Sequence, residues 1–271
     1  MRINTNMMAL NASNKLVGNQ SAVQKSINKL SSGMRINSAA DDAAGLAISE
    51  KMRSQIRGLN QAESNAQDGI SLIQTAEGAL QQTTDILQRM RELVIKSENS
   101  GVLSEEDKTA IDTEMAELST EIDRIAKSTT FNGKALLDGS CETKELKFKI
   151  GANTLEKDTL TVSIGSMSAE SLGINTIKTE PTKALDTIDK AISKVSSQRA
   201  KLGAIQNRME YAIESISVTG ENLTSAESRI RDVDMAEEMV NYTKTSILNQ
   251  SAMAMLAQAN QQPQSILSLL G

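Results

Sequence analysis

The chain has 271 residues, a net charge of −5 with both signs interspersed, no histidine and a single cysteine. This composition excludes Ser-His-Asp and Cys-His nucleophile systems, His-ligated zinc and an internal disulfide. The chain has only 2 Tyr, 2 Phe and no Trp, a composition that favours long helices with narrow apolar seams. No basic block lies among aromatic residues, which argues against nucleic acid as a partner.

The N-terminal segment predicts an amphipathic helix whose apolar side chains begin almost at the first residue. Its stripe consists of Leu16, Val23, Ile27, Leu30 and Met34, and it is preceded by Ile3, Met7, Met8 and Leu10. Chain ends usually fray and are usually polar, so large aliphatic side chains are unusual there. Polar residues 4–6 interrupt any apolar h-region, which argues against a cleaved signal peptide. No run of about 18 apolar residues is present to insert into a membrane.

A very regular seam predicts one continuous helix from about residue 43 to residue 98. Small or apolar residues recur at alternating steps of three and four, as in a coiled coil, at Leu59, Ala62, Ala66, Ile70, Ile73, Ala76, Leu80, Thr83, Leu87, Met90 and Val94. Before it, Ser38 and Asp41 have the spacing of a capping box. Asp41 and the adjacent Asp42 would project about 100° apart on a helix, so we do not expect acid–base or metal chemistry from them.

A second helix, over about 104–128, completes a helical hairpin. Ser104 and Asp107 have the spacing of a capping box, and the seam consists of Ile111, Met115, Leu118, Ile122 and Ile125. The stretches "LKFKI" and "TLTVSI" then alternate as strands do, around the turn-rich "GANTLEKD", which predicts a small β-hairpin within about 131–180. Cys141 lies in the charged, turn-like stretch "DGSCETKE", where we expect an inert thiol at the surface.

The last third of the chain predicts two more helical segments. The first runs from about residue 182 to 227, with a seam that is interrupted by Arg199 and loosened around Gly220. The second carries two adjacent apolar stripes, Leu248-Ala252-Met255-Ala259-Ile266-Leu269 and Met253-Leu256-Leu267-Leu270. Two stripes need more than one neighbour, and isolated helices rich in Gln and Asn are marginal in water. We therefore expect both chain ends to be assembly surfaces that other copies complete.

These elements predict a mainly α fold, with long coiled-coil helices from both chain ends and a helical-hairpin domain that carries a small β-hairpin region. Six stretches, "MRINTNMMALNA", "LSSGMRINSAADDAAGLAIS", "QRMRELVIKSEN", "TTFNGKALL", "SAESRIRDVDMAEEM" and "SILSLLG", together resemble the bacterial flagellin family over nearly the whole chain.

The resemblance implies a structural subunit of the bacterial flagellar filament, which serves swimming motility, and not an enzyme. Residues 1–44 and 228–271 would pair as the inner tube of the filament. Residues 45–227 would form the outer-tube domain, with helices at about 45–98, 104–128 and 182–227, a β-hairpin region at about 131–180, and no large variable outer domains. The implied location is the extracellular flagellum, reached without a cleaved signal peptide.

The implied partners are further copies of the chain, the flagellar export apparatus with an export chaperone, and the filament cap and hook-junction proteins. No cofactor or metal is implied. The residues expected to carry polymerisation are Ile3, Met7, Leu10, Leu16, Val23, Ile27, Leu30, Leu248, Met253, Met255, Leu256, Ile266, Leu267, Leu269 and Leu270.

A second recognition surface is expected on "QRMRELVIKSEN". If Leu87, Met90 and Val94 face inward, Arg89 and Leu93 fall on roughly the opposite face of the helix. The resemblance implies that these two residues, with Glu114, contact a neighbouring subunit and, in the released monomer, a Toll-like receptor of animal hosts.

Two other classes of function stay open at this point. A cytosolic coiled-coil scaffold or adaptor would also have apolar seams, but it would stop at a small closed oligomer instead of growing into long tubes. An enzyme would need a catalytic constellation, and we find none in the sequence.

Overall fold

The computed structural model describes residues 6–98, 103–153, 158–175 and 181–270, without the side chains of residues 143, 181–182 and 263–270. The elements in chain order are α1 (Met7–Ser32), α2 (Ala43–Ser97), α3 (Glu105–Ser128), β1 (Thr130–Phe131), β2 (Lys134–Ala135), α4 (Ser140–Thr143), β3 (Leu146–Lys149), β4 (Thr159–Val162), α5 (Ala169–Leu172), α6 (Pro181–Arg231) and α7 (Met235–Leu270). The chain divides into a terminal unit, Met1–Ser54 with Asn222–Gly271, and a central unit, Gln55–Glu221.

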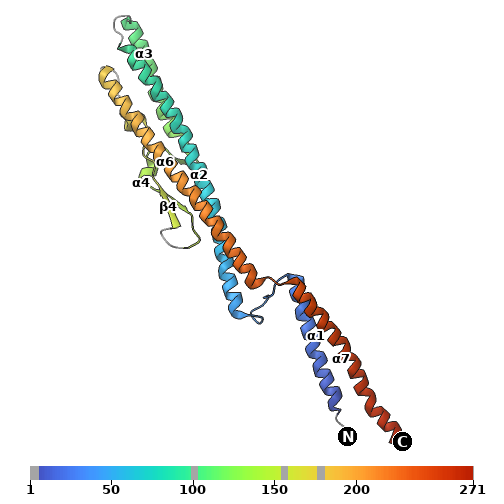
Figure 1. The fold of residues 1–271 in the computed structure, drawn as a ribbon. Helices are drawn as coiled ribbons and strands as arrows, with labels where there is room; N and C mark the ends of the chain where they lie inside the picture. The colour runs from blue at the N-terminus through green and yellow to red at the C-terminus, as the bar shows by residue number, and fades with distance from the viewer. Residues whose placement is uncertain (1–5, 99–102, 154–157, 176–180, 271) are drawn as a thin grey trace. The chain divides into compact units, whose positions relative to one another are not determined.

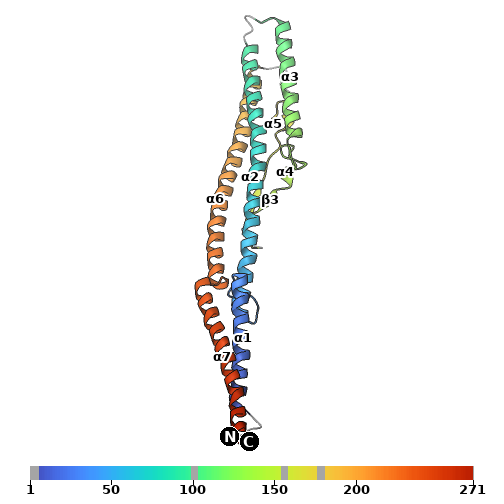
Figure 2. The same ribbon diagram turned by 90° about the vertical axis from the view of Figure 1, so that its right-hand side faces the viewer.

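The terminal unit pairs α1 with α7 in antiparallel directions (Figures 1 and 2). Asn6 caps the start of α1, because its side chain accepts a hydrogen bond from the Ala9 amide. Gly33 ends α1 in the left-handed conformation, with φ of 69°, which glycine adopts without strain. The predicted pairing of the chain ends as helices is confirmed.

The two links that follow α1 and α6 are joined to each other. The Arg35 amide donates to the Arg231 carbonyl at 2.7 Å, and the Val233 amide donates to the Gly33 carbonyl at 3.1 Å. The Arg231 guanidinium also reaches Glu50 on α2 at 2.8 Å. Helix α6 continues to Arg231, past the boundary placed at about residue 227, and it runs through Gly220.

The start of α2 differs from the predicted capping box. Asp42 caps the helix, since its carboxylate accepts from the Gly45 amide at 2.8 Å. Asp41 instead closes a separate turn by accepting from the amide and hydroxyl of Ser38, each at 3.0 Å. The Ser38 amide, followed by the Ser38 hydroxyl, lowers the pKa of Asp41. Asp41 therefore orders the link, and the assignment of Ser38 and Asp41 to the helix cap is wrong.

The central unit packs α2, α3 and the first part of α6 around one apolar core. The predicted seam of α2 is buried from Leu59 to Val94, apart from half-buried Ile70. Ser104 and Asp107 form the predicted capping box at the start of α3. The largest fully buried side chains of this unit are Ile73, Leu80, Leu87, Met90, Ile122, Leu136, Leu137, Ile164, Ile174, Ile188 and Leu202. Arg199, which interrupts the predicted α6 seam, pairs with Glu77 at 3.6 Å.

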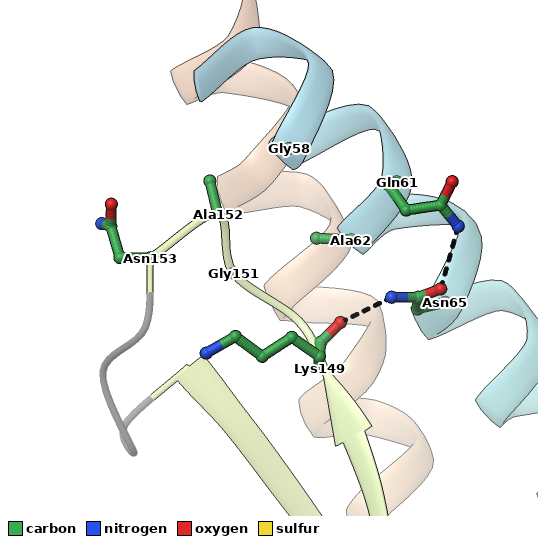
Figure 3. Close-up of a pocket in the computed structure, with 8 residues that line it drawn as sticks. All are labelled: Gly58, Gln61, Ala62, Asn65, Lys149, Gly151, Ala152 and Asn153. Carbon is green, nitrogen blue, oxygen red and sulfur yellow. Dashed lines mark hydrogen bonds between the residues drawn. The ribbon is translucent and has the colours of Figure 1, made fainter. Parts of the chain in front are cut away.

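The predicted β-hairpin is present as the antiparallel pair β3–β4, in which Phe148 faces Leu160. Its turn includes residues 154–157, which lie outside the described residues. Figure 3 shows the strand end against α2: the Asn65 side-chain amide donates to the Lys149 carbonyl at 3.1 Å and accepts from Gln61 at 3.0 Å. A Cβ on Gly58 would lie only 3.0 Å from the Ala152 side chain, so glycine allows this close approach.

A second small hairpin and two short helices were not predicted. Strands β1 and β2 pair across Asn132 and Gly133, which both have positive φ, as a two-residue Asn-Gly hairpin turn requires. Helix α4 follows Gly139, and α5 begins at the cap Ser168. These elements are too short to give a periodic signal in the sequence.

The expected surface position of Cys141 is wrong. Its side chain is 4% exposed and belongs to the central core, and its thiol donates to the Ala135 carbonyl at 3.2 Å. The turn residues around it are real, but they fold the segment into one helical turn whose apolar side packs inward. A charged, turn-like sequence context therefore did not identify which side chain is buried.

We expect the Cys141 thiol to react with a thiol-specific dye only when the central unit opens. Labelling of the native protein should be slower than labelling in denaturant by at least about a hundredfold, because core positions become accessible only through unfolding reactions. Mass spectrometry of time points would follow the reaction. Rapid stoichiometric labelling of the folded protein would contradict the burial.

Candidate functional site

The contact between α1 and α7 is made largely by small and polar side chains. On α7 the buried or half-buried residues are Glu238, Tyr242, Thr245, Ser246, Asn249, Ala252, Leu256 and Ala259. On α1 they are Ala9, Ala12, Ser13, Leu16, Asn19, Ala22, Val23, Ser26, Lys29 and Leu30. Such a seam buries little apolar area, so it contributes little hydrophobic stabilisation to an isolated pair.

Most of the other large apolar side chains of the same helices are exposed on their outer faces. We call them the outward surface: Met7, Met8, Leu10, Val17 and Ile27 on α1, and Met235, Met239, Val240, Ile247, Leu248, Met253 and Met255 on α7. Val240 is 68% exposed and Met255 is 69% exposed. A shallow depression on α7 is lined by Met239, Val240, Thr243, Lys244 and Ile247. Extended apolar exposure of this kind marks a surface that another protein covers.

The structure separates the predicted polymerisation residues into two groups. Those on the outward surface are Met7, Leu10, Ile27, Leu248, Met253 and Met255. Those half-buried between the helices of the pair are Leu16, Val23, Leu30 and Leu256. Ile3 lies outside the described residues, and so do the side chains of Ile266, Leu267, Leu269 and Leu270, although α7 continues to Leu270.

Five outward residues were missed by the sequence analysis: Val17, Met235, Met239, Val240 and Ile247; Met8 was noted at the N-terminus but was not placed among the polymerisation residues. They lie beside the stripes that were identified. They could have been found by counting the apolar residues on every face of each helix and not only along one stripe. A helix that is apolar on several sides needs several neighbours.

The expected recognition surface is only partly present on the outside of the central unit. Arg89 is exposed, and its guanidinium bonds Glu114 on α3 at 2.9 Å and Glu92 at 3.3 Å. The hydrogen bond and charge of Glu114 raise the pKa of Arg89. These contacts hold the Arg89 and Glu114 side chains together at the surface.

Leu93 is 2% exposed and belongs to the core, so its predicted outward position is wrong. The helical-wheel argument took one inward seam for α2. In the central unit α2 packs against both α3 and α6, which widens its buried face to include Leu72 and Leu93 beside the seam.

The described residues hold no group of three or more acidic or thiol side chains that could bind a metal ion. None of the helices in the described part of the chain combines the length and apolar content needed to cross a bilayer.

Two family descriptions match the chain: the bacterial flagellin N-terminal helical region over residues 3–142, and the C-terminal helical region over residues 185–270. The chain is 53% identical over 305 residues to the flagellin of Bacillus subtilis (strain 168), and 52% identical over 288 residues to the flagellar filament 33 kDa core protein of Treponema phagedenis. Both alignments cover 100% of each protein.

Among solved structures, a putative flagellar hook-associated protein from Vibrio parahaemolyticus matches with a TM-score of 0.58. The match covers 71% of this chain and 100% of that one, and its 14% identity makes it evidence for the fold alone.

Proposed function

We propose that copies of this chain assemble through the outward surface of α1 and α7. The chain belongs to the bacterial flagellin family, and it is a structural subunit of the flagellar filament, not an enzyme. Membership of this family implies self-assembly into a filament and a role in motility. The finer proposal concerns which residues make the contacts between copies.

The observation that carries it is the reversed distribution of side chains in the α1–α7 pair. Small and polar residues lie between the helices, while Met255, Val240 and similar side chains are exposed to water. Covering each such side chain contributes about 1.5–3 kcal/mol before ordering costs, and a polymer repeats the gain in every subunit. A single subunit lacks this stabilisation, because these side chains stay exposed to water.

We propose that the parts of the chain occupy the two tubes of the filament that the resemblance implies. Residues 1–44 and 228–271 would form the inner tube of the filament, and residues 45–227 the outer tube. The central unit has its own apolar core and the terminal unit has almost none, which supports a self-sufficient outer part and an inner part that depends on neighbours.

The assembly proposal is tested by seeding. Purified subunit added to sheared filament fragments should extend them into long tubes, whereas a scaffold or adaptor would stop at a closed oligomer. Deleting residues 266–271 should lower the sedimented fraction to near that of an unseeded control, while circular dichroism of the central helices stays unchanged. Normal filament growth by the deletion variant would refute a role for these residues.

We further propose that the subunit reaches the extracellular flagellum through the flagellar export apparatus, with an export chaperone, and meets cap and hook-junction proteins there. Membership of the flagellin family, as the resemblance implies it, supports export without cleavage. The intact mass of the assembled protein should then equal that of the full chain, and a shorter mature form would contradict it.

A second surface is proposed around Arg89 and Glu114, for a neighbouring copy in the filament and for a Toll-like receptor when the subunit is free. Both side chains are exposed and fixed by their mutual hydrogen bonds, which supports recognition of their fixed arrangement. The proposed surface leaves out Leu93, because its side chain is 2% exposed.

A further inference from the structure

Helix α7 contains a proline well inside its length. Pro263 is one of two prolines in the chain, and α7 extends to Leu270 beyond it. In an α-helix each carbonyl accepts from the amide four residues later, and proline has no amide hydrogen. The Ala259 carbonyl is therefore the one inside α7 that lacks its usual donor because of proline.

That carbonyl accepts a hydrogen bond from the other helix of the pair. The side-chain amide nitrogen of Asn6 donates to the Ala259 oxygen at 2.8 Å. The other atom of the same amide, Oδ1, accepts from the Ala9 amide at 3.1 Å and caps α1. Ala259 is 7% exposed, so water has little access to replace the Asn6 donor.

The rest of the seam does little to fix the alignment of the two helices. Small and polar side chains such as Ser13, Asn249 and Ala252 occupy much of it, and they interlock less than large knobs in holes do. A slip of one helical turn would keep most of these contacts. It would, however, change which apolar side chains stand beside each other on the outward surface.

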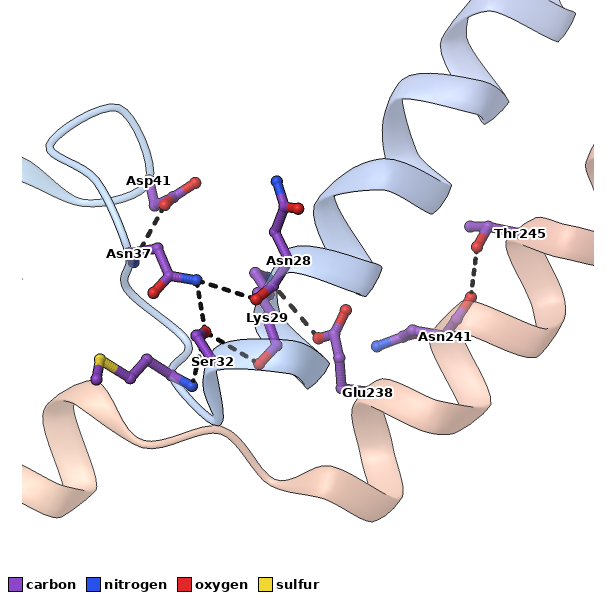
Figure 4. Close-up of polar contacts among 9 residues, drawn as sticks. Asn28, Lys29, Ser32, Asn37, Asp41, Glu238, Asn241 and Thr245 are labelled. Atoms are coloured by element: carbon purple, nitrogen blue, oxygen red, sulfur yellow. Dashed lines mark hydrogen bonds and ion pairs between the residues drawn. The ribbon is translucent and has the colours of Figure 1, made fainter.

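At the other end of the pair the alignment is set next to the links (Figure 4). Lys29 Nζ lies 3.8 Å from Glu238 Oε2, and the Asn37 side-chain amide donates to Ser32 at 2.7 Å, which fixes the end of α1. At the far end of the pair, within the part of the chain whose side chains are described, the Asn6 amide joins α1 to α7 and can hold this end in place.

We propose that Asn6 sets the alignment of the end of the pair that lies farthest from the links, by bonding the carbonyl that Pro263 leaves without its intrahelical donor. In a slipped pair Asn6 would meet carbonyls already bonded within α7, and the Ala259 oxygen would lose the Asn6 amide. Asn6 is thus a positioning residue that determines which outward surface is presented. The inference goes beyond assembly, because the alignment exists within one chain.

The alignment can be measured with cysteine pairs in the full chain, in a Cys141→Ser background. Ser13 and Ala252 lie one heptad from Asn6 and Ala259, so the double variant Ser13→Cys/Ala252→Cys reports the observed alignment. The variants Ser13→Cys/Asn249→Cys and Ser13→Cys/Leu256→Cys report slips of one turn in either direction. Intrachain disulfides are quantified by mass spectrometry in soluble subunit and in sedimented polymer.

With Asn6 present, the observed-alignment disulfide should exceed each slipped disulfide by about tenfold, the factor that one hydrogen bond to a buried acceptor can set. Asn6→Asp keeps the cap acceptor for Ala9 but removes the donor, so the ratio should fall to near one. Asn14→Asp, the same change at an exposed position of α1, should leave the ratio unchanged.

Pro263→Ala gives the most selective result. It restores the amide donor for Ala259 and favours the helix, yet the ratio should fall because the Ala259 carbonyl no longer differs from the others. A purely stabilising role for Asn6 predicts a higher ratio in this variant. An unchanged ratio in both Asn6→Asp and Pro263→Ala, equal yields of all disulfides in the parent, or loss of every disulfide in Asn6→Asp would overturn the proposal.

Discussion

Leu93→Ala is expected to lower the free energy of unfolding of the central unit by about 2–5 kcal/mol, because it removes a buried side chain from a closely packed core. Urea unfolding followed by circular dichroism would measure the loss. Ile95→Ala is the matched control, since Ile95 is on the same helix but 47% exposed, and it should be nearly neutral. A similar small effect for both variants would contradict the core position of Leu93.

Substitutions at Arg89, in contrast to Leu93→Ala, should change binding and leave the free energy of unfolding nearly unchanged. Arg89→Ala removes exposed ion pairs with Glu114 and Glu92, and such pairs contribute little to stability, so unfolding should hardly change. Binding to a neighbouring copy or to the receptor should fall in Arg89→Glu. If the two side chains act only through their mutual pairing, the double variant Arg89→Glu/Glu114→Arg would restore binding. If the partner contacts them directly, the double variant stays defective.

The sequence predicted the seam of α2 and the cap of α3 because both depend on local spacing. Alternating steps of three and four select one face of a helix, and Ser104 with Asp107 needs only a three-residue separation. Leu93 was misplaced for a different reason. How wide a buried face is depends on how many neighbours the helix has, and that is a property of the tertiary fold.

The terminal helices show the same limit more strongly. Periodicity indicated apolar stripes at both ends, but it could not say whether Leu16 or Met7 would face α7 within the same chain. Only the paired structure shows that α7 turns Ala252 and Asn249 inward and Met255 outward. The Asn6–Ala259 contact joins residues 253 positions apart and leaves no periodic trace in either segment.

Met255→Asp should prevent filament growth at concentrations where the parent polymerises, without disturbing either helix of the subunit. In the free chain Met255 is 69% exposed, so the substitution costs little there. In the polymer it would lose about 1.5–3 kcal/mol of apolar burial and also bury a carboxylate without a partner, so the subunit concentration needed for growth should rise by at least about a hundredfold.

Met255→Leu preserves apolar size and is the control that separates the charge from the change of residue. It should polymerise at a concentration close to that of the parent, because volume-conserving apolar substitutions are tolerated in packed contacts.

Leu256→Asp, one residue further along α7, compares the face that packs on α1 with the outward surface. Leu256 is half-buried beside α1, so this variant should weaken the helix pair itself. Sedimentation over a range of concentrations and intrachain cross-linking of α1 to α7 give both readouts. Met255→Asp should lose growth and keep the cross-link, whereas normal growth of Met255→Asp would show that the outward surface is not where copies meet.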